Sequence, residues 1–523
     1  MSWWAQATLL VNHDSCFPAY CSCNLSRFLN AAMLPTLIAI LASSSVAAKT
    51  CSPLKNRDIF STVEVEVGTP SQRFELVADT GSNTLIVQSC VCQELGSCPS
   101  SFGRCFRGNA TSTFSIARSQ NGDGDPHVWI LKYGSGDIEA LVTTDFVSVG
   151  SYTARMNSSL LLMVSQSLNF DASFEGILGL GVPNVTAKIG PAGGTHRQPE
   201  VLTSFLDGAR VNHFSLCFNS GNDGVLALDY ETAAKPLAST SREHWQLKLL
   251  GASVAGHQIS MGQDTAKHSA IPDSGTTLIT GPQEQIAALL ESICEKWPRC
   301  KTAREELNIA MVQTLSKTAS KGGVASRSKT RLLDAYARWH ESSAGAFAQA
   351  NASFTGSGAF ALQMLMEDCS SWKTGVHLNA EMPTIKLHLE GADGTNQDVQ
   401  LLPSSYVAEV TANAMVWTQK YLLGILPYWW PELEEDSSCA TLLGSAEYVG
   451  HQVWILGTPL FYNRRVHFDL GSPPSVGFSD EPCGSCVSGE YQNDISLAQS
   501  HSAGMRQLRH PGRVPWPKTS ESY

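Results

Sequence analysis

One short pattern, an acid followed by small and hydroxyl residues, occurs twice in this chain of 523 residues. It reads Asp-Thr-Gly-Ser at 79–82 and Asp-Ser-Gly-Thr at 273–276, and each copy follows a largely apolar run. In such a turn the glycine lets the backbone bend sharply, and the hydroxyl groups can hydrogen-bond to the carboxylate. Two turns of this kind facing each other would bring the carboxyl groups of Asp79 and Asp273 to one point, which is a catalytic arrangement.

Two carboxyl groups within hydrogen-bonding distance cannot both ionise cheaply, so the pair holds one proton over a wide pH range. One carboxyl can then remove a proton from water while the other protonates or polarises a carbonyl group. A single copy would be weak evidence, because Asp-x-Gly is mainly a turn signal. Each copy, however, is followed downstream by a second repeated pattern, Ile177-Leu178-Gly179 and Ile455-Leu456-Gly457. The double repetition favours a catalytic pair over two unrelated turns.

The order and spacing of these motifs resemble the pepsin-like aspartic protease family, from about Ile59 to Asp480. Residues 133–136 (Tyr-Gly-Ser-Gly) resemble the family's flap hairpin, which closes over the substrate. Segments 175–181 and 454–459 are similar to those that support the two aspartate loops. The resemblance implies an all-β, bilobal fold with two related six-stranded-type β lobes and the active site in the cleft between them.

The same resemblance assigns the catalytic role to Asp79 and Asp273. Water held between the two carboxyl groups would attack the carbonyl of a peptide bond, with no metal, no cofactor and no covalent intermediate. Hydroxyl residues would orient the outer carboxylate oxygens or tie the two loops together beneath the pair. These supporting residues are Thr80, Ser82, Ser274 and Thr276.

Substrate binding is implied for residues of the flap and of the two turns. The flap residues would close over an extended peptide, and the others would hydrogen-bond to its backbone. The expected substrate-binding residues are Gly81, Tyr133, Gly134, Ser135, Gly275 and Thr277. The implied substrates are proteins or peptides, and we expect the protein to be a monomer.

Two positions depart from the family pattern. The family usually has a tryptophan shortly after the first aspartate, hydrogen-bonded to the flap tyrosine, whereas this chain has Ile86. Trp129 is the candidate to compensate for that loss. Pro272 directly precedes Asp273 and removes one backbone donor there.

These departures keep a second function open, that of a catalytically silent homologue that binds a peptide or a protein. A glycosidase also uses two carboxyl groups, but it needs them about 5–9 Å apart rather than in contact. The net charge of −11 argues against a nucleic acid as partner.

The N-terminal segment has the pattern of a targeting sequence. The stretch Met33–Leu41 is mostly apolar, Arg27 lies upstream, and Val46-Ala47-Ala48 fits a cleavage site for a signal peptide. Alternatively, Phe28–Ala48 has no charged residue and is long enough to act as an uncleaved signal anchor. Either reading of residues 1–48 implies the secretory pathway, with the mature protein secreted or in an endomembrane or lysosome-like lumen.

The cysteines fit that route, because 12 of the 15 follow residue 48 and their number is even. The cluster Cys90, Cys92, Cys98 and Cys105 would suit a zinc site in isolation, but the secretory signal and the family resemblance favour two local disulfides. Cys369 and Cys439 flank a position where the family often has a disulfide. Cys217 has two candidate partners, Cys483 and Cys486. Four asparagines match the glycosylation pattern: Asn109, Asn157, Asn184 and Asn351.

The duplication defines the domain boundaries. We expect an N-terminal lobe at 55–230, a linker at 231–241 and a C-terminal lobe at 242–486, followed by a polar, disordered tail at 487–523. The distance from the aspartate to the glycine of the second motif is 100 positions in the first lobe and 184 in the second, so the second lobe contains an insertion. We place this insertion near 296–358.

The helical content of the second lobe is expected around that insertion. Pro282–Trp297 is predicted to be an amphipathic helix, because its isoleucines and leucines share one face. The insertion itself is predicted to be a solvated loop with one helix near Arg331–Trp339.

Overall fold

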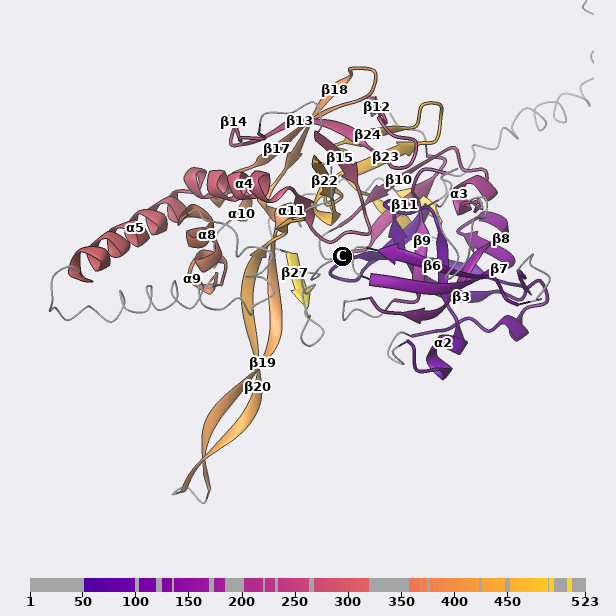
Figure 1. Cartoon of the computed structure of the whole chain (residues 1–523), viewed down its shortest axis with the longest axis horizontal. Coiled ribbons are helices and arrows are strands. Elements are labelled where there is room, and N and C mark those ends of the chain that lie inside the picture. Colours follow the sequence, from indigo (N-terminus) through magenta and orange to yellow (C-terminus); the bar gives the residue numbers. More distant parts are fainter. Residues whose placement is uncertain are drawn as a thin grey trace, which may run out of the picture. The chain divides into compact units, whose positions relative to one another are not determined.

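The structure is a computed structural model. It describes residues 51–98, 103–118, 125–133, 136–168, 174–183, 202–219, 222–230, 234–262, 268–318, 357–367, 369–373, 377–422, 426–446, 452–487, 489–492 and 506–509. Figure 1 shows the arrangement of the strands and helices. The expected helix at Arg331–Trp339 and the N-terminal targeting segment lie outside these residues.

Four strands surround the first aspartate. β3 (Gln72–Asp79) pairs in parallel with β9 (Gly176–Gly179), β9 pairs antiparallel with β4 (Leu85–Gln88), and β4 pairs in parallel with β8 (Tyr152–Gln166). The first Asp turn connects β3 to β4. Asp79 therefore lies where two parallel strands end side by side.

Four strands repeat this arrangement around the second aspartate. β15 (His268–Pro272) pairs in parallel with β22 (Gln452–Leu456), β22 pairs antiparallel with β16 (Ile279–Gly281), and β16 pairs in parallel with β21 (Leu443–Ser445). The order and the strand directions match those of the first unit. The repeat in the sequence is thus also a repeat of topology.

The first unit belongs to a 14-stranded sheet and the second to an 8-stranded sheet. The larger sheet runs β12-β24-β23-β10-β11-β1-β2-β3-β9-β4-β8-β7-β5, with β6 paired to β7. The other strands of this sheet are β1 (Cys51–Asn56), β2 (Ser61–Val67), β5 (Ser115–Ile116), β6 (Val128–Tyr133), β7 (Gly136–Val149), β10 (His213–Cys217), β11 (Gly224–Leu228), β12 (Pro236–Ala238), β23 (Arg465–Asp469) and β24 (Ser475–Ser479).

The smaller sheet runs β18-β17-β13-β15-β22-β16-β21, with β14 paired to β13. Its other strands are β13 (Leu247–Val254), β14 (His257–Gln258), β17 (Ile385–Glu390) and β18 (Asn396–Leu401).

Side-chain alternation explains why these segments form strands with one face in the core. In β2, Val63, Val65 and Val67 are fully buried, whereas Glu64 is exposed. β17 alternates in the same way. Apolar side chains on one face of each strand pack into the core, which stabilises the sheets by burying apolar area. The all-β, bilobal fold implied by the sequence is confirmed.

The helices of the second lobe lie mainly next to the expected insertion. α4 (Gln283–Lys296) buries Ile286, Leu289, Leu290 and Ile293, which confirms the predicted amphipathic helix. The other helices of the second lobe are α5 (Pro298–Thr318), α8 (Ser357–Glu367), α9 (Ser370–Lys373), α10 (Leu378–Glu381) and α11 (Pro403–Tyr406), with the 3-10 turn η3 (Thr458–Leu460). The first lobe contains α2 (Cys90–Glu94), α3 (Phe205–Gly208) and the 3-10 turn η1 (Gly108–Ala110). None of the helices within the described ranges is long and apolar enough to cross a membrane.

The first third of the expected insertion loop is a helix, α5, so the expectation of a loop is wrong for residues 298–318. A disulfide between Cys294 and Cys300 joins its start to α4. Arg304 on α5 hydrogen-bonds to Glu291 of α4 at 3.0 Å and also pairs with Glu295. The helix is therefore fastened by covalent and ionic contacts in addition to the burial of Leu307.

A long hairpin is the part of the second lobe that the sequence did not indicate. β19 (Val407–Leu422) and β20 (Leu426–Thr441) pair antiparallel along their whole length, as Figure 1 shows. β27 (Arg506–Arg509) adds a parallel strand to the start of β19. β25 (Ser485–Val487) and β26 (Glu490–Gln492) form a short hairpin. The segment from 487 onward, expected to be disordered, therefore contains strands in its described parts.

All 12 cysteines after residue 48 are paired in disulfides. The cluster near the first Asp turn forms Cys90–Cys105 and Cys92–Cys98, and Cys369 is joined to Cys439. Cys217 is bonded to Cys483, and Cys486 is bonded to Cys51 instead. The remaining pair is Cys294–Cys300. The two open alternatives for Cys217 are thus resolved in favour of Cys483.

Candidate active site

The two aspartates occupy equivalent positions at strand ends. Asp79 is the last residue of β3 and lies opposite Gly179 of β9 in the parallel pair. Asp273 directly follows β15, and its backbone N–H donates to the carbonyl of Leu456 at 3.0 Å. Strand ends place both carboxyl groups on a rigid support, which favours a fixed geometry.

Each carboxylate accepts the same two hydrogen bonds from its own turn. In the first turn the N–H of Gly81 donates to Oδ1 of Asp79 at 2.8 Å, and Oγ of Ser82 donates to Oδ2 at 2.5 Å. In the second turn Gly275 and Thr276 donate to Oδ1 and Oδ2 of Asp273 at 2.9 and 2.6 Å. These donors fix the orientation of both carboxyl planes.

The two turns are joined by reciprocal hydrogen bonds beneath the carboxyl groups. The N–H of Thr80 donates to Oγ of Ser274 at 3.0 Å, and the N–H of Ser274 donates to Oγ1 of Thr80 at 2.9 Å. Each hydroxyl also donates to a carbonyl of the opposite strand: Thr80 to Pro272 at 3.0 Å and Ser274 to Ala78 at 2.7 Å. Pro272 therefore supplies its carbonyl to this junction, although it has no N–H.

The carboxyl groups of Asp79 and Asp273 lie side by side. A β-carbon added to Gly81 would lie 2.7 Å from the carboxylate of Asp273, and one added to Gly275 would lie 2.4 Å from Oδ1 of Asp79. Only glycine at these two positions leaves room for such an approach. Burial first, and then the negative charge of Asp273, raise the pKa of Asp79 to about 7. The pair is therefore suited to holding one proton in acid and near neutrality.

The flap tyrosine, Tyr133, reaches the first Asp turn. Its hydroxyl lies 3.4 Å from Oγ1 of Thr84. Burial raises the pKa of the Tyr133 phenol, so the hydroxyl keeps its proton. Thr84 is a residue that the sequence analysis missed, because a threonine in a turn carries no distinctive signal. Gly134 and Ser135 lie outside the described residues.

The tryptophan of the flap strand donates its indole N–H to a histidine of the same strand region. Nε1 of Trp129 donates to Nε2 of His127 at 3.1 Å, so the expectation that Trp129 replaces the missing family tryptophan does not hold. Ile86 is fully buried and packs in the same apolar cluster as Trp129 and Tyr133. The hydroxyls of Thr84 and Ser82, rather than an indole, are thus the hydrogen-bond partners of the flap tyrosine.

The last expected substrate-binding residue, Thr277, contacts another part of the chain. Its hydroxyl donates to the carbonyl of Ile59 at 2.9 Å. This bond joins the segment between β1 and β2 to the second Asp turn.

The glycosylation candidates are only partly described. The side chains of Asn109 and Asn157 are exposed, as glycosylation requires. Asn184 and Asn351 lie outside the described residues.

Comparison with known proteins agrees with this geometry. Residues 61–480 match the family model for eukaryotic aspartyl protease. The chain is 30% identical to pepsin A from Sus scrofa over 258 residues, which is 46% of this chain and 60% of the relative. It is 28% identical to renin from Echis ocellatus over 235 residues, 44% of this chain and 56% of the relative. It is 27% identical to cathepsin D from Dictyostelium discoideum over 246 residues, 44% of this chain and 58% of the relative. The aligned part thus spans less than two thirds of each relative, whereas the family model covers most of this chain. The chain belongs to the eukaryotic aspartyl protease family.

Proposed function

We propose that this protein is an aspartic endopeptidase that hydrolyses peptide bonds with a water molecule activated between Asp79 and Asp273. The observation that carries the proposal is the close approach of two carboxyl groups that each accept the same kinds of hydrogen bond from their own turns, together with the raised pKa of Asp79. Family membership is consistent with this activity.

In the proposed reaction the pair begins with one proton. The ionised carboxyl accepts a proton from water, and the oxygen of that water attacks the peptide carbonyl. The protonated carboxyl gives its proton to the carbonyl oxygen, which forms a tetrahedral intermediate. The intermediate collapses when the carboxyl that took the proton from water gives it to the amide nitrogen and the C–N bond breaks. One hydroxyl of the intermediate returns its proton to the other carboxyl as the new carboxylic acid forms. The pair is then left with one proton, as at the start.

The substrate is proposed to be an extended segment of a protein or peptide, held by backbone hydrogen bonds beneath the flap. Six disulfides in the described chain favour an oxidising compartment, such as the lumen of the secretory pathway or the exterior of the cell. Exposed Asn109 and Asn157 suit glycosylation along this route.

The test is cleavage of a mixed peptide library from acidic to neutral pH by the wild type and by Asp79→Asn and Asp273→Asn. Each substitution removes one ionisable carboxyl while keeping its size, so cleavage should fall at least ~10³-fold and the fold should remain intact. A statine-type inhibitor should block the wild type.

Circular dichroism and thermal unfolding of both variants serve as the control for folding. A folded wild type that cleaves no peptide but still binds peptides would support the alternative of a catalytically silent binding protein. Substantial activity in either variant would rule out the two-carboxyl mechanism.

A further inference from the structure

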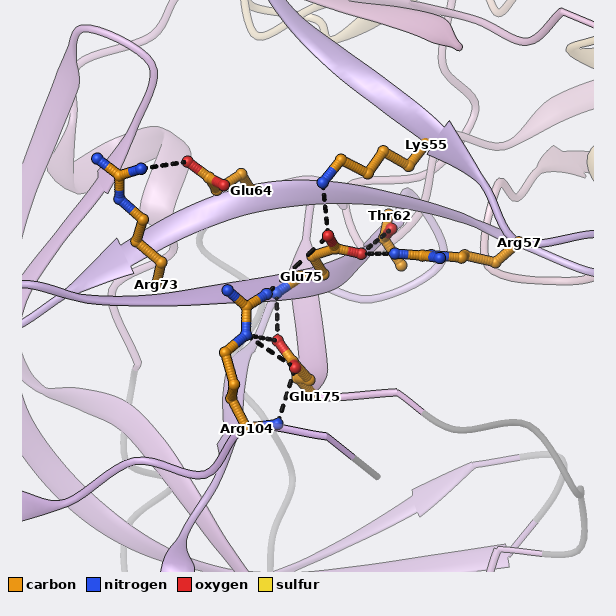
Figure 2. Close-up of polar contacts among 8 residues, drawn as sticks. All are labelled: Lys55, Arg57, Thr62, Glu64, Arg73, Glu75, Arg104 and Glu175. Carbon is orange, nitrogen blue, oxygen red and sulfur yellow. Dashed lines mark hydrogen bonds and ion pairs between the residues drawn. The ribbon is translucent and has the colours of Figure 1, made fainter. Parts of the chain in front are cut away.

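Two glutamates lie at the same level of the parallel strand pair that carries Asp79. Glu75 is four residues before Asp79 on β3, and Glu175 is four residues before Gly179, directly ahead of β9. The strands pair Asp79 with Gly179 and Val77 with Ile177, so the register places Glu75 beside Glu175. Their side chains are only 15% and 12% exposed. Figure 2 shows the two carboxylates among cationic side chains from other segments.

The side chain of Glu175 extends the ladder between β3 and β9. β9 begins at Gly176, and Oε2 of Glu175 accepts the backbone N–H of Glu75 at 2.6 Å. The backbone carbonyl of Glu175 accepts the N–H of Gln88 of β4 at 2.9 Å. One residue therefore fastens the start of β9 to both neighbouring strands. At the other end of β9, Leu180 donates its N–H to the carbonyl of Asp79 at 2.6 Å.

Arg104 holds the other oxygen of Glu175. Its backbone N–H and its Nε donate to Oε1 of Glu175 at 2.8 and 3.0 Å, as Figure 2 shows. Arg104 is next to Cys105, which is joined to Cys90 by a disulfide. Gly103 has φ of +78°, and a β-carbon there would lie 2.6 Å from Oε1 of Glu175. The backbone of this disulfide-closed loop thus approaches the carboxylate as closely as glycine allows.

Glu75 is neutralised by cations from a third segment. Nζ of Lys55 lies 2.6 Å from Oε1 of Glu75, and Arg57 pairs with Oε2. Burial alone would raise the pKa of Glu75, but the contacts with Lys55 and Arg57 outweigh burial and hold it below its ordinary value. Without those cations two carboxylates at one level of the sheet would repel each other.

We propose that Glu175 is a positioning residue for Asp79, and that the contact with Arg104 makes the disulfide-closed loop part of the support of the catalytic pair. This inference rests on the proposed function. The side chain of Glu175 fixes the longitudinal position of β9 against β3, and β9 in turn sets the position of Asp79. A displacement of β9 would move one carboxyl relative to the other and change both the reaction rate and the sharing of the proton.

The test compares Glu175→Gln with Glu64→Gln, a matched control. Glu64 is on β2, is 44% exposed and pairs with Arg73 at 3.7 Å. Its strand pairs with β1, β3 and β7. Gln at 175 keeps one acceptor oxygen and places an NH2 group at the other position, so either the N–H of Glu75 or the backbone N–H of Arg104 loses its acceptor. We measure kcat, KM and the pH profile of kcat/KM, with the concentration of active enzyme determined by titration with a tight statine-type inhibitor.

Glu175→Gln should lower kcat by ~10-fold or more, with KM within about twofold, because a small misplacement acts mainly on the chemical step. Its apparent pKa values in the pH profile should shift, which a residue needed only for stability would not cause. Glu64→Gln should match the wild type in kcat and in the pH profile. Arg104→Gln, which leaves Glu175 in place, should reproduce part of the effect, and the double variant should show a non-additive loss.

Several outcomes would overturn the inference. If folded Glu175→Gln has the kcat and pH profile of the wild type, Glu175 has no positioning role. If Glu175→Gln does not fold, the same measurements on Arg104→Gln take its place. A wild-type kcat and pH profile in folded Arg104→Gln would then contradict the inference. If Asp79→Asn abolishes cleavage while Glu175→Gln is normal, this inference alone fails. If the wild type does not cleave peptides, the proposed function fails as well.

Discussion

Thr80 and Ser274, 194 residues apart in the sequence, exchange backbone-to-hydroxyl hydrogen bonds at 3.0 and 2.9 Å. Both side chains are almost fully buried. Thr80 and Ser274 thus hold the two Asp turns at a fixed separation. Neither side chain is charged, so protonation of Asp79 or Asp273 does not weaken these hydrogen bonds.

The first prediction concerns this junction. Thr80→Val keeps the shape of the side chain but leaves the buried N–H of Ser274 without its acceptor. The free energy of unfolding should fall by about 1–3 kcal/mol, the usual cost of an unsatisfied buried donor. Urea unfolding at pH 5 measures it. Thr153→Val, at an exposed threonine, is the control and should change stability by less than about 0.5 kcal/mol. Equal stability of Thr80→Val and the wild type would contradict the prediction.

The second prediction is a pH dependence of activity. Since the pKa of Asp79 is raised to about 7 by burial and by Asp273, the pair keeps its shared proton in acid and loses it as pH rises through about 7. Peptide cleavage should therefore be high in acid and fall above neutral pH. A profile of kcat/KM against pH measures this, and constant activity from pH 6 to 9 would contradict it.

The third prediction is a pH dependence of stability. The folded protein holds a proton on Asp79 between the unfolded pKa of 3.8 and the folded value of about 7, so this group lowers stability as pH rises through that window. Asp79→Asn removes the titration. The variant should gain stability relative to the wild type between pH 4 and pH 8, by about 1–4 kcal/mol. Thermal or urea unfolding of both proteins at the two pH values gives the difference. A constant difference would mean that Asp79 does not titrate in this range.

The fourth prediction concerns the glycine of the second Asp turn. A β-carbon at Gly275 would lie 2.4 Å from Oδ1 of Asp79, so Gly275→Ala must push the carboxyl groups apart. We expect kcat to fall ~10²-fold with the protein still folded. Gly251→Ala, where the nearest atom would lie 3.4 Å away, is the matched control and should keep its activity. Full activity of Gly275→Ala would show that the second Asp turn lies farther from the carboxyl group of Asp79 than this distance indicates.

The fifth prediction concerns the flap tyrosine. Thr84→Val removes one hydroxyl partner of Tyr133 and should lower kcat/KM by about 3–10-fold, in line with the loss of one hydrogen bond. Thr84→Ser keeps the hydroxyl and should stay close to the wild type. Steady-state kinetics of both variants, at equal active-site concentration, decide the matter. Equal kcat/KM in the Val and Ser variants would show that the hydroxyl of Thr84 does not help to position the flap tyrosine.

The sequence was most informative where local chemistry and local shape coincide. Each Asp turn needs an acid, a hydroxyl and a glycine at fixed positions, so Asp79 and Asp273 were recognisable. The period of apolar residues likewise located α4 and the alternating strand β2.

Other features were not predictable because they depend on distant or unusual contacts. α5 has only a weak apolar periodicity, and its contacts with α4 through Arg304 and a disulfide have no local sequence signal. β20 contains Pro427 and Pro431, which cannot donate to a ladder and which therefore argue against a strand in the sequence. The contact of Tyr133 with Thr84 joins residues 49 positions apart and has no sequence signal.

The route of the chain through the larger sheet has a consequence for its synthesis. β10 pairs on one side with β11, but its other neighbour is β23, about 250 residues later. While the ribosome makes the intervening residues, β10 has an unpaired edge next to apolar side chains, a typical site of aggregation. The nascent chain can close that edge only after residue 469 has left the exit tunnel. The half-finished sheet therefore has to be protected from aggregation throughout the translation of the second lobe.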